Sequence, residues 1–389
     1  MPHPNISLFN QVLGLVDRNI FSRIVKRYDS DKHCKGINSW SHVVSMLFMQ
    51  LSGVSSLRDI STGLRSATGN LNHLGLSKAP SKSALSYINA NRTHEVFEDL
   101  YFELLEKFTP SVQRGRAYAR RLKRKIFIMD ASIIPLSLSL FDWAQYRTHK
   151  GAVKLHAVLD YDNGLPSYAV LTDGKTHDVT QARATAFPSK SVLIIDRAYV
   201  DYEWLNNLDS SGVFFVTRLK SNADIQVVET FLTDEKHQHI LSDQDIRLTG
   251  FKSSKKYPKN LRVVRVYDQQ NDKHLVLLTN NLSWTADTIS QLYRARWDVE
   301  VFFKHLKQIF RVKSFVGTSP NAVRIQMWCS MIAMLLISYL KSKADFKWHL
   351  SNLIAFIRIN LFVKIDLWKW VNKPILENAN SPPQQTLFS

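Results

Sequence analysis

The chain has 389 residues, and 51 Lys and Arg against 33 Asp and Glu give it a net charge of +18. This length allows two or three domains with a buried core, and the positive excess favours a polyanionic partner, most simply nucleic acid. The two cysteines, Cys34 and Cys329, show no CxxC and no Cys/His ligand spacing, so we expect no zinc site, no disulfide framework and a reducing cytoplasm.

Residues 1–110 are predicted to form a helical domain that binds DNA. Ser56 opens a capping box for a short helix, and after a turn-rich segment Ser81 or Ser83 starts another. This arrangement is compatible with a helix-turn-helix unit, although a piece of a helical bundle without DNA contacts fits equally well. The side chains expected on the exposed face of the second helix are Lys82, Ser86, Asn89 and Arg92.

Residues 111–125 form a dense run of Arg and Lys, which is predicted to be a basic linker. The run leads directly into an apolar strand, and this placement suits it to hold a phosphate backbone. A merely solvated linker is the alternative.

The pattern changes to α/β over residues 126–220. An apolar strand from Ile126 ends at Asp130, and a continuous apolar strand from Ser191, of the kind that is buried on both faces, ends at Asp196. Further strands are predicted at 153–159, 167–171 and 213–219, and helices at 179–186 and 202–208. Three antiparallel strands followed by helix, strand, helix and strand is the order of a ribonuclease-H-like core with a mixed five-stranded sheet.

Residues 221–282 interrupt this core before its last helix and are predicted to form a β-rich insertion with a basic loop near Lys255. Residues 283–345 are predicted to hold the final core helices, and 346–389 a C-terminal helical segment with a loose tail. The longest uncharged stretch, Ile325 to Leu340, is shorter than the roughly 20 residues of a membrane span. The N-terminus lacks the pattern of a signal peptide. We therefore expect a buried helix at 325–340 and no membrane partner.

The stretch from Leu292 to Phe310 is predicted to be one amphipathic helix. At about 100° per residue, one stripe collects Tyr293, Arg296, Glu300, Lys304 and Lys307. A solvated helix with a Glu300–Lys304 salt bridge explains this stripe without any function. The alternative is a carboxylate that binds a metal, flanked by cations that bind phosphates.

The acids predicted at the ends of two apolar strands, Asp130 and Asp196, favour the metal-binding interpretation of Glu300. In a ribonuclease-H-like core the first and fourth strands are neighbours, so Asp130 and Asp196 are expected to converge with Glu300. Three carboxylates at one point repel one another unless a cation lies among them, and oxygen ligands select Mg²⁺ or Mn²⁺. A pair of such ions suits phosphodiester cleavage and transfer. A lone Asp at a strand end is more often a turn or cap residue, so the prediction rests on the three together.

The same residues carry a resemblance to a known family. Tyr, two residues, Arg, three residues, Glu, six residues and Lys is the signature of DDE-type transposases of the insertion-sequence-four family, and this chain matches it with Tyr293, Arg296, Glu300 and Lys307. Asp196 to Tyr199 resembles the family's second Asp motif, and Phe127 to Ser132 the first. The resemblance is strong over residues 125–310 and looser before them.

The resemblance implies specific roles. Asp130, Asp196 and Glu300 would be catalytic ligands of two Mg²⁺ or Mn²⁺ ions. The residues that would contact DNA are Tyr293, Arg296, Lys307, Arg197, Lys154 and His156. The implied partners are double-stranded DNA, as transposon ends and target, and a second copy of the chain on DNA, in a bacterial cytoplasm at the nucleoid.

The expected function is a DNA transposase that binds terminal inverted repeats, cleaves them by metal-dependent hydrolysis and joins the free 3′-hydroxyl ends to target DNA. A nuclease without strand transfer and an inactive DNA-binding derivative are the alternatives. In relatives an aromatic side chain of the insertion stacks on a flipped base. This chain has Lys273-His274 where that Trp is expected. Trp284 is a candidate substitute, and a Trp with only a packing role is the alternative.

Overall fold

The computed structural model describes residues 5–34, 36–67, 69–112, 122–136, 141, 143, 145–147, 150–233, 237–309 and 315–374. These residues form two compact units. The first comprises Met1–Val112, Ser314–Gly317 and Asn321–Ser389, and the second Gln113–Lys313 and Thr318–Pro320. Most of the predicted basic linker and the C-terminal tail lie outside the described residues.

The first unit is helical, as predicted for residues 1–110. Ser56 Oγ accepts a hydrogen bond from the backbone N–H of Asp59, and Ser81 Oγ from that of Ala84, so the capping residues start the predicted helices. The helices of this unit are α1 (Leu8–Leu13), α2 (Arg18–Arg27), α3 (Ser39–Ser52), α4 (Leu57–Ser66), α5 (Lys82–Asn91), α6 (Glu95–Val112), α13 (Pro320–Lys343), α14 (Leu350–Ile359) and α15 (Leu367–Asn372).

Helix α13 forms the apolar centre of this unit. By length and composition it could cross a membrane, but 89% of its apolar window is buried within the structure. The ring of Tyr339 in α13 stacks on Phe108 in α6, with 4.2 Å between the ring centroids. The expectation of a buried helix is confirmed. The predicted domain boundary differs, since α13 groups with the N-terminal helices rather than completing the α/β core.

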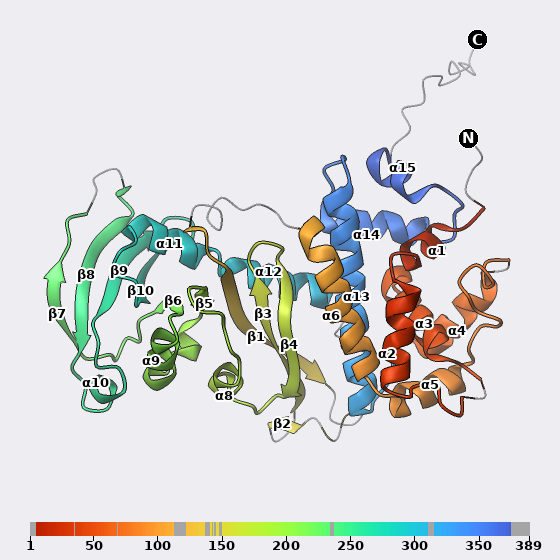
Figure 1. Cartoon of the computed structure of the whole chain (residues 1–389), viewed down its shortest axis with the longest axis horizontal. Coiled ribbons are helices and arrows are strands. Elements are labelled where there is room, and N and C mark those ends of the chain that lie inside the picture. Colours follow the sequence, from red (N-terminus) through yellow and green to blue (C-terminus); the bar gives the residue numbers. More distant parts are fainter. Residues whose placement is uncertain are drawn as a thin grey trace, which may run out of the picture. The chain divides into compact units, whose positions relative to one another are not determined.

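The second unit is built on one mixed sheet (Figure 1). Its strands are β1 (Ile126–Leu136), β2 (Gln145–Arg147), β3 (Lys150–Asp160), β4 (Leu165–Asp173), β5 (Val192–Ile195), β6 (Phe214–Arg218), β7 (Ile225–Thr230), β8 (Ile240–Leu248), β9 (Leu261–Asp268) and β10 (Lys273–Thr279). Its helical elements are α8 (Asp178–Arg183), the 3₁₀ turn η1 (Arg197–Tyr199), α9 (Tyr202–Ser210), α10 (Ser253–Lys256), α11 (Ala286–Arg294) and α12 (Trp297–Gln308).

The sheet order is β2-β3-β1-β5-β6-β10-β9-β8-β7, with β4 paired to β3. Strand β1 pairs antiparallel with β3 and parallel with β5, so the two strands predicted to end in acids are neighbours. The predicted insertion differs from expectation in one respect. Strand β10 pairs antiparallel with β6, so the inserted strands extend the same sheet instead of forming a separate lobe.

The two faces of the sheet have different neighbours. Phe127 and Met129 of β1 belong to a buried cluster with Leu205 of α9. Successive side chains of a strand point to opposite faces, so Ile128 and Asp130 are directed to the other face. Helix α12 contacts β1, and none of its residues belongs to the α9 cluster. Asp130 of β1 therefore faces α12.

The single helix predicted from Leu292 to Phe310 is two helices. The chain leaves α11 at Ala295, where backbone N–H groups donate to carbonyls three residues earlier (Ala295 to Leu292, Arg296 to Tyr293). Helix α12 then begins at Trp297. Tight i→i−3 turns of this kind change the direction of a helix, so Tyr293 and Glu300 lie on different helices.

Candidate active site

Asp130 and Asp196 lie at the same level on neighbouring strands. Asp196 directly follows β5, but β1 does not end at Asp130 as predicted, because its pairing with β3 continues to Leu136. Met129 of β1 is paired with Ile195 of β5 in parallel register, so the acids that follow them are at equivalent positions. Glu300 lies in the first turn of α12. Each of the three side chains is thus positioned by a different element, and each element is fixed by burial of its apolar residues.

One cavity of about 500 Å³ brings the three acids together, as predicted. It is lined by Asp130, Ala131, Ser132, Asp196, Arg296, Glu300, Phe303, Lys304, Lys307 and Gln308. Asp298, the other acid in the first turn of α12, is not among these residues. Arg296, Lys304 and Lys307 therefore line the same cavity as the three acids.

Arg296 lies among the carboxylates. Its Nη1 is 3.6 Å from Asp130 Oδ2, and its Nη2 donates a hydrogen bond to Glu300 Oε1. The guanidinium-bearing side chain is only 18% exposed. Within the described residues, the ion pair of Glu300 is with Arg296, not with Lys304 as the solvated-helix alternative supposes. The three carboxylates do not form a closed cluster in which all ligand atoms lie within 4.8 Å of one another, in the part of the chain that is described.

The electrostatic setting separates the two aspartates. Burial raises the pKa of Asp130 to about 6, against the opposing effects of the Ala131 N–H and of Arg296, while the charges of Asp196 and Glu300 raise it further. Burial also acts to raise the pKa of Asp196. Hydrogen bonds from the Arg197 backbone and from Arg218, whose Nη2 lies 2.6 Å from Asp196 Oδ1, outweigh that effect and lower it. Opposed shifts of neighbouring acids are typical of functional sites.

Two lysines border the same cavity. Lys307 Nζ donates a hydrogen bond of 2.6 Å to Ser132 Oγ, and the exposed Lys304 lies one helical turn before it. Ser132 and Arg218 were not among the predicted site residues. The sequence carried a signal for each, because Ser132 lies two residues after Asp130 on the same face of β1, and Arg218 ends β6 as Asp196 follows β5.

Tyr293 and Arg197 differ in access. Tyr293 is 7% exposed, burial raises its pKa, and the guanidinium carbon of Arg296 lies 5.9 Å from its ring centroid. The buried ring of Tyr293 thus lies beside the guanidinium of Arg296 and helps to position it. Arg197 is exposed at the start of η1, directly after Asp196.

His156 and Lys154 are turned into the structure. The side chain of His156 is 0% exposed, and its Nε2 lies 3.0 Å from Thr172 Oγ1. Lys154 Nζ donates to the carbonyl of Thr176 at 2.8 Å and lies 3.1 Å from Asp178 Oδ1. Burial of His156 argues against the direct DNA contact expected for it. Its hydrogen bond ties β3 to β4, while Lys154 ties β3 to the start of α8 and the residues just before it.

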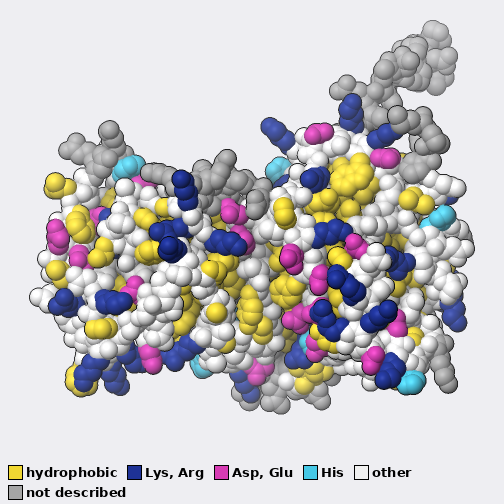
Figure 2. Space-filling model, in the orientation of Figure 1, with side chains coloured by type: hydrophobic (Ala, Val, Ile, Leu, Met, Phe, Trp, Pro, Cys, Tyr) yellow, Lys and Arg dark blue, Asp and Glu magenta, His cyan; other side chains and the backbone are white. Residues whose placement is uncertain are grey.

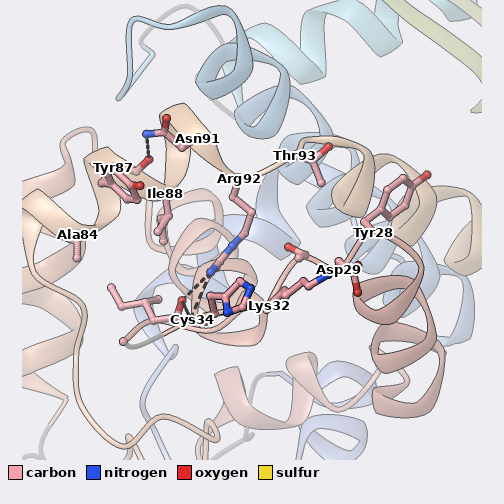
Figure 3. Close-up of a pocket in the computed structure, with 14 residues that line it drawn as sticks. Tyr28, Asp29, Lys32, Cys34, Ala84, Tyr87, Ile88, Asn91, Arg92 and Thr93 are labelled. Carbon is pink, nitrogen blue, oxygen red and sulfur yellow. Dashed lines mark hydrogen bonds and ion pairs between the residues drawn. The ribbon is translucent and has the colours of Figure 1, made fainter.

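The N-terminal helix α5 also differs from expectation. Asn89 is buried, and its Oδ1 lies 2.7 Å from Nε2 of the buried His42. Arg92 is 9% exposed, and its Nη2 donates to the carbonyl of Ile37 at 2.8 Å. Figure 3 shows this guanidinium reaching towards Cys34 across a pocket of about 650 Å³. Both side chains hold the helices together, which leaves Lys82 and Ser86 exposed on α5.

The insertion presents basic and aromatic groups. Lys and Arg side chains gather over α10 in Figure 2, where Lys255 Nζ lies 4.2 Å from the ring centroid of the exposed Phe251. Trp284 is half-buried against Phe214, with ring centroids 5.2 Å apart. That contact favours a packing role for Trp284 over a stacking platform for a base.

The chain is similar to known proteins over most of its length. The transposase DDE domain family matches residues 121–336, and a domain family of unknown function, DUF4372, matches residues 4–77. A protein of Sinorhizobium fredii with a transposase name is 32% identical over 67% of this chain and 71% of its own length. A protein of Geobacillus stearothermophilus, named as a transposase for insertion sequence element IS5377, is 27% identical over 69% and 71%. The solved synaptic complex of piggyBac transposase with hairpin DNA reaches a TM-score of 0.42 at 12% identity over 97% of this chain and 85% of that one.

Proposed function

The chain belongs to the transposases with a DDE domain, and we propose that the cavity around Asp130, Asp196 and Glu300 is the active site with which it cuts and joins DNA. The observation that carries the assignment of the site is that three acids from three separate elements line one cavity together with Arg296 and Lys307. The order of β1, β3, β4, β5 and β6 supports a ribonuclease-H-like core, and the Tyr-Arg-Glu-Lys spacing supports the insertion-sequence-four family.

The donor set fits divalent metal ions. Three carboxylates offer hard oxygen ligands, and the raised pKa of Asp130 reflects the cost of gathering buried negative charge, which a cation relieves. Asp130, Asp196 and Glu300 would hold two Mg²⁺ or Mn²⁺ ions. Bound there, such ions supply activation of a water or 3′-hydroxyl and stabilisation of the leaving oxygen.

The remaining residues bind and orient DNA. Arg296 offers a planar fork and Lys307 a point charge to the phosphates, while Tyr293 packs behind Arg296. Arg197 and Lys304 are exposed beside the same acids and extend the cationic surface. In this arrangement His156 and Lys154 position β3 and do not touch the DNA.

The DNA consists of the terminal inverted repeats of an insertion sequence and a target duplex, inside a bacterial cell at the nucleoid. The net charge of +18 and the predicted basic linker support binding along a phosphate backbone. Two copies of the chain would pair two ends. The N-terminal helices would contribute to end binding.

A joining assay tests the proposal. A labelled fragment that ends in the inverted repeat is incubated with the full chain, Mn²⁺ and a supercoiled target plasmid. Label joined to the plasmid is the expected result. Nicked fragment without joined label would instead identify a nuclease without strand transfer, and bound but uncut DNA, unchanged in Glu300→Ala, would identify an inactive DNA-binding derivative.

A further inference from the structure

A second group of metal-ligating side chains lies outside the cavity of the three acids. His237 and His239 stand just before β8, and Asp287 lies in the first turn of α11. One ligand atom from each residue can be chosen so that all three lie within 4.8 Å of one another. Two separate segments of the chain therefore bring together three side chains of the types that bind transition metals.

The distances from the two histidine nitrogens to the Asp287 oxygen are those expected of ligands that share a metal ion, and they are longer than hydrogen bonds. His239 Nε2 lies 3.4 Å from Asp287 Oδ1, and His237 Nδ1 lies 3.7 Å from the same oxygen. Hydrogen bonds from nitrogen to oxygen are shorter, about 2.7–3.2 Å. Ligands of a tetrahedral ion with bonds of about 2.0 Å stand roughly 3.3 Å apart, close to both observed separations.

One of the ligand atoms, Nε2 of His239, also makes no hydrogen bond within the described structure. This nitrogen is buried. The backbone of the same residue is fixed, because its carbonyl accepts the N–H of Tyr267 at 2.8 Å. A buried nitrogen aimed at a carboxylate and free of other partners is available as a ligand.

Access and charge favour binding as well. The side chain of His237 is 42% exposed, that of His239 22% and that of Asp287 17%, so the site is open at one side and enclosed at the other. Neutral imidazoles and one carboxylate prefer Zn²⁺ to Mg²⁺, whose usual ligands are oxygens. Three protein ligands leave a fourth position for water or another group.

We propose that His237, His239 and Asp287 form a Zn²⁺ site that is distinct from the site of the three acids. The ion would tie the start of β8 to the first turn of α11, the helix that leads into Arg296 and Glu300. The cysteine spacing could not reveal this site, because its ligands are two histidines near one another and an aspartate about 50 residues later.

Zinc binding by the full chain tests the proposal. The acids of the other cavity are first neutralised by Asp130→Asn and Glu300→Gln, and Zn²⁺ is then titrated in excess Mg²⁺ by calorimetry. We expect one Zn²⁺ per chain and a rise in the midpoint of thermal unfolding on binding. His237→Ala and His239→Ala should weaken binding by more than the roughly 10- to 100-fold typical of losing a supporting group. His274→Ala, an exposed histidine of the same insertion, should bind as before.

Absence of saturable Zn²⁺ binding would overturn the proposal, as would binding that His237→Ala and His239→Ala leave unchanged. Circular dichroism of each variant establishes that it is folded, and the exposed position of His237 makes its replacement the safer of the two. None of these measurements depends on DNA cleavage, so their outcome is independent of the proposed transposase site.

Discussion

Nη1 of Arg296 lies 3.6 Å from Oδ2 of Asp130. Arg296 directly precedes α12, at the break after α11, so its guanidinium reaches Asp130 in the middle of β1 and also Glu300 one turn along α12. Without a cation among them, the three acids of this cavity would repel one another. The arginine of the signature therefore contributes charge balance within the site, in addition to its proposed contact with a phosphate.

The charge of Asp130 should destabilise the folded chain at neutral pH. Its pKa in the fold is about 6, above the ordinary value of 3.8, so the folded state binds the proton more tightly. The resulting stability is fully present below pH 3.8 and is lost as the pH rises through 6. At pH 7.5 in a chelating buffer, Asp130→Asn should raise the free energy of unfolding by about 1 to 3 kcal/mol.

Denaturant unfolding at a series of pH values checks this prediction. The advantage of Asp130→Asn should shrink as the pH falls from 7 to 4, while the variant loses DNA cleavage at every pH. A variant that is less stable than the native chain at pH 7.5 would show that the ionised carboxylate is stabilised by its neighbours instead.

Lys304 should contribute to DNA binding through charge alone. It is exposed at the border of the acid cavity and lies one turn before Lys307. Lys304→Ala should reduce the slope of log affinity against log salt by about 0.9 for duplex DNA, the value for one phosphate contact. Fluorescence anisotropy at several salt concentrations measures the slope. Lys347→Ala, an exposed lysine of the other unit, serves as the control, and equal slopes for both variants would remove Lys304 from the interface.

His156 should matter for folding and not for DNA contact. Burial lowers its pKa to about 4, so the imidazole is neutral at pH 7. His156→Ala should lower the free energy of unfolding by about 1 to 3 kcal/mol, through a cavity and the loss of the hydrogen bond between His156 and Thr172. The salt slope of DNA binding by the folded variant should not change. An unaltered free energy of unfolding together with a smaller salt slope would show that His156 contacts the DNA.

The local sequence pattern was sufficient to predict that Asp130, Asp196 and Glu300 lie near one another. Continuous apolar runs identified β1 and β5 as buried strands, and a shared register then placed Asp130 and Asp196 at one level. Glu300 was predicted from its spacing to Arg296 and Lys307. The break between α11 and α12 does not alter this spacing, because Trp297 to Gln308 form one helix. The convergence of the three acids was therefore predictable before any contact was known.

Features that depend on distant partners were not predictable. Pairing of β10 with β6 joins segments about 60 residues apart, and nothing in either strand specifies the other. His156 lies on β3, where polar and apolar positions are both buried between neighbouring strands, so alternation does not mark its face. The turn at Ala295 is composed of good helix formers, and only packing of α11 and α12 on different strands reveals it.

The most direct test of the active site compares two acids of one helix. Glu300→Gln and Asp298→Asn each remove one negative charge from the first turn of α12, but only Glu300 lines the cavity. Cleavage of end-bearing DNA in Mg²⁺ or Mn²⁺ should fall by about 10²- to 10³-fold or more in Glu300→Gln, with end binding retained. It should stay close to the native rate in Asp298→Asn. Equal cleavage rates for the two variants would contradict the assignment of Asp130, Asp196 and Glu300 as the active site.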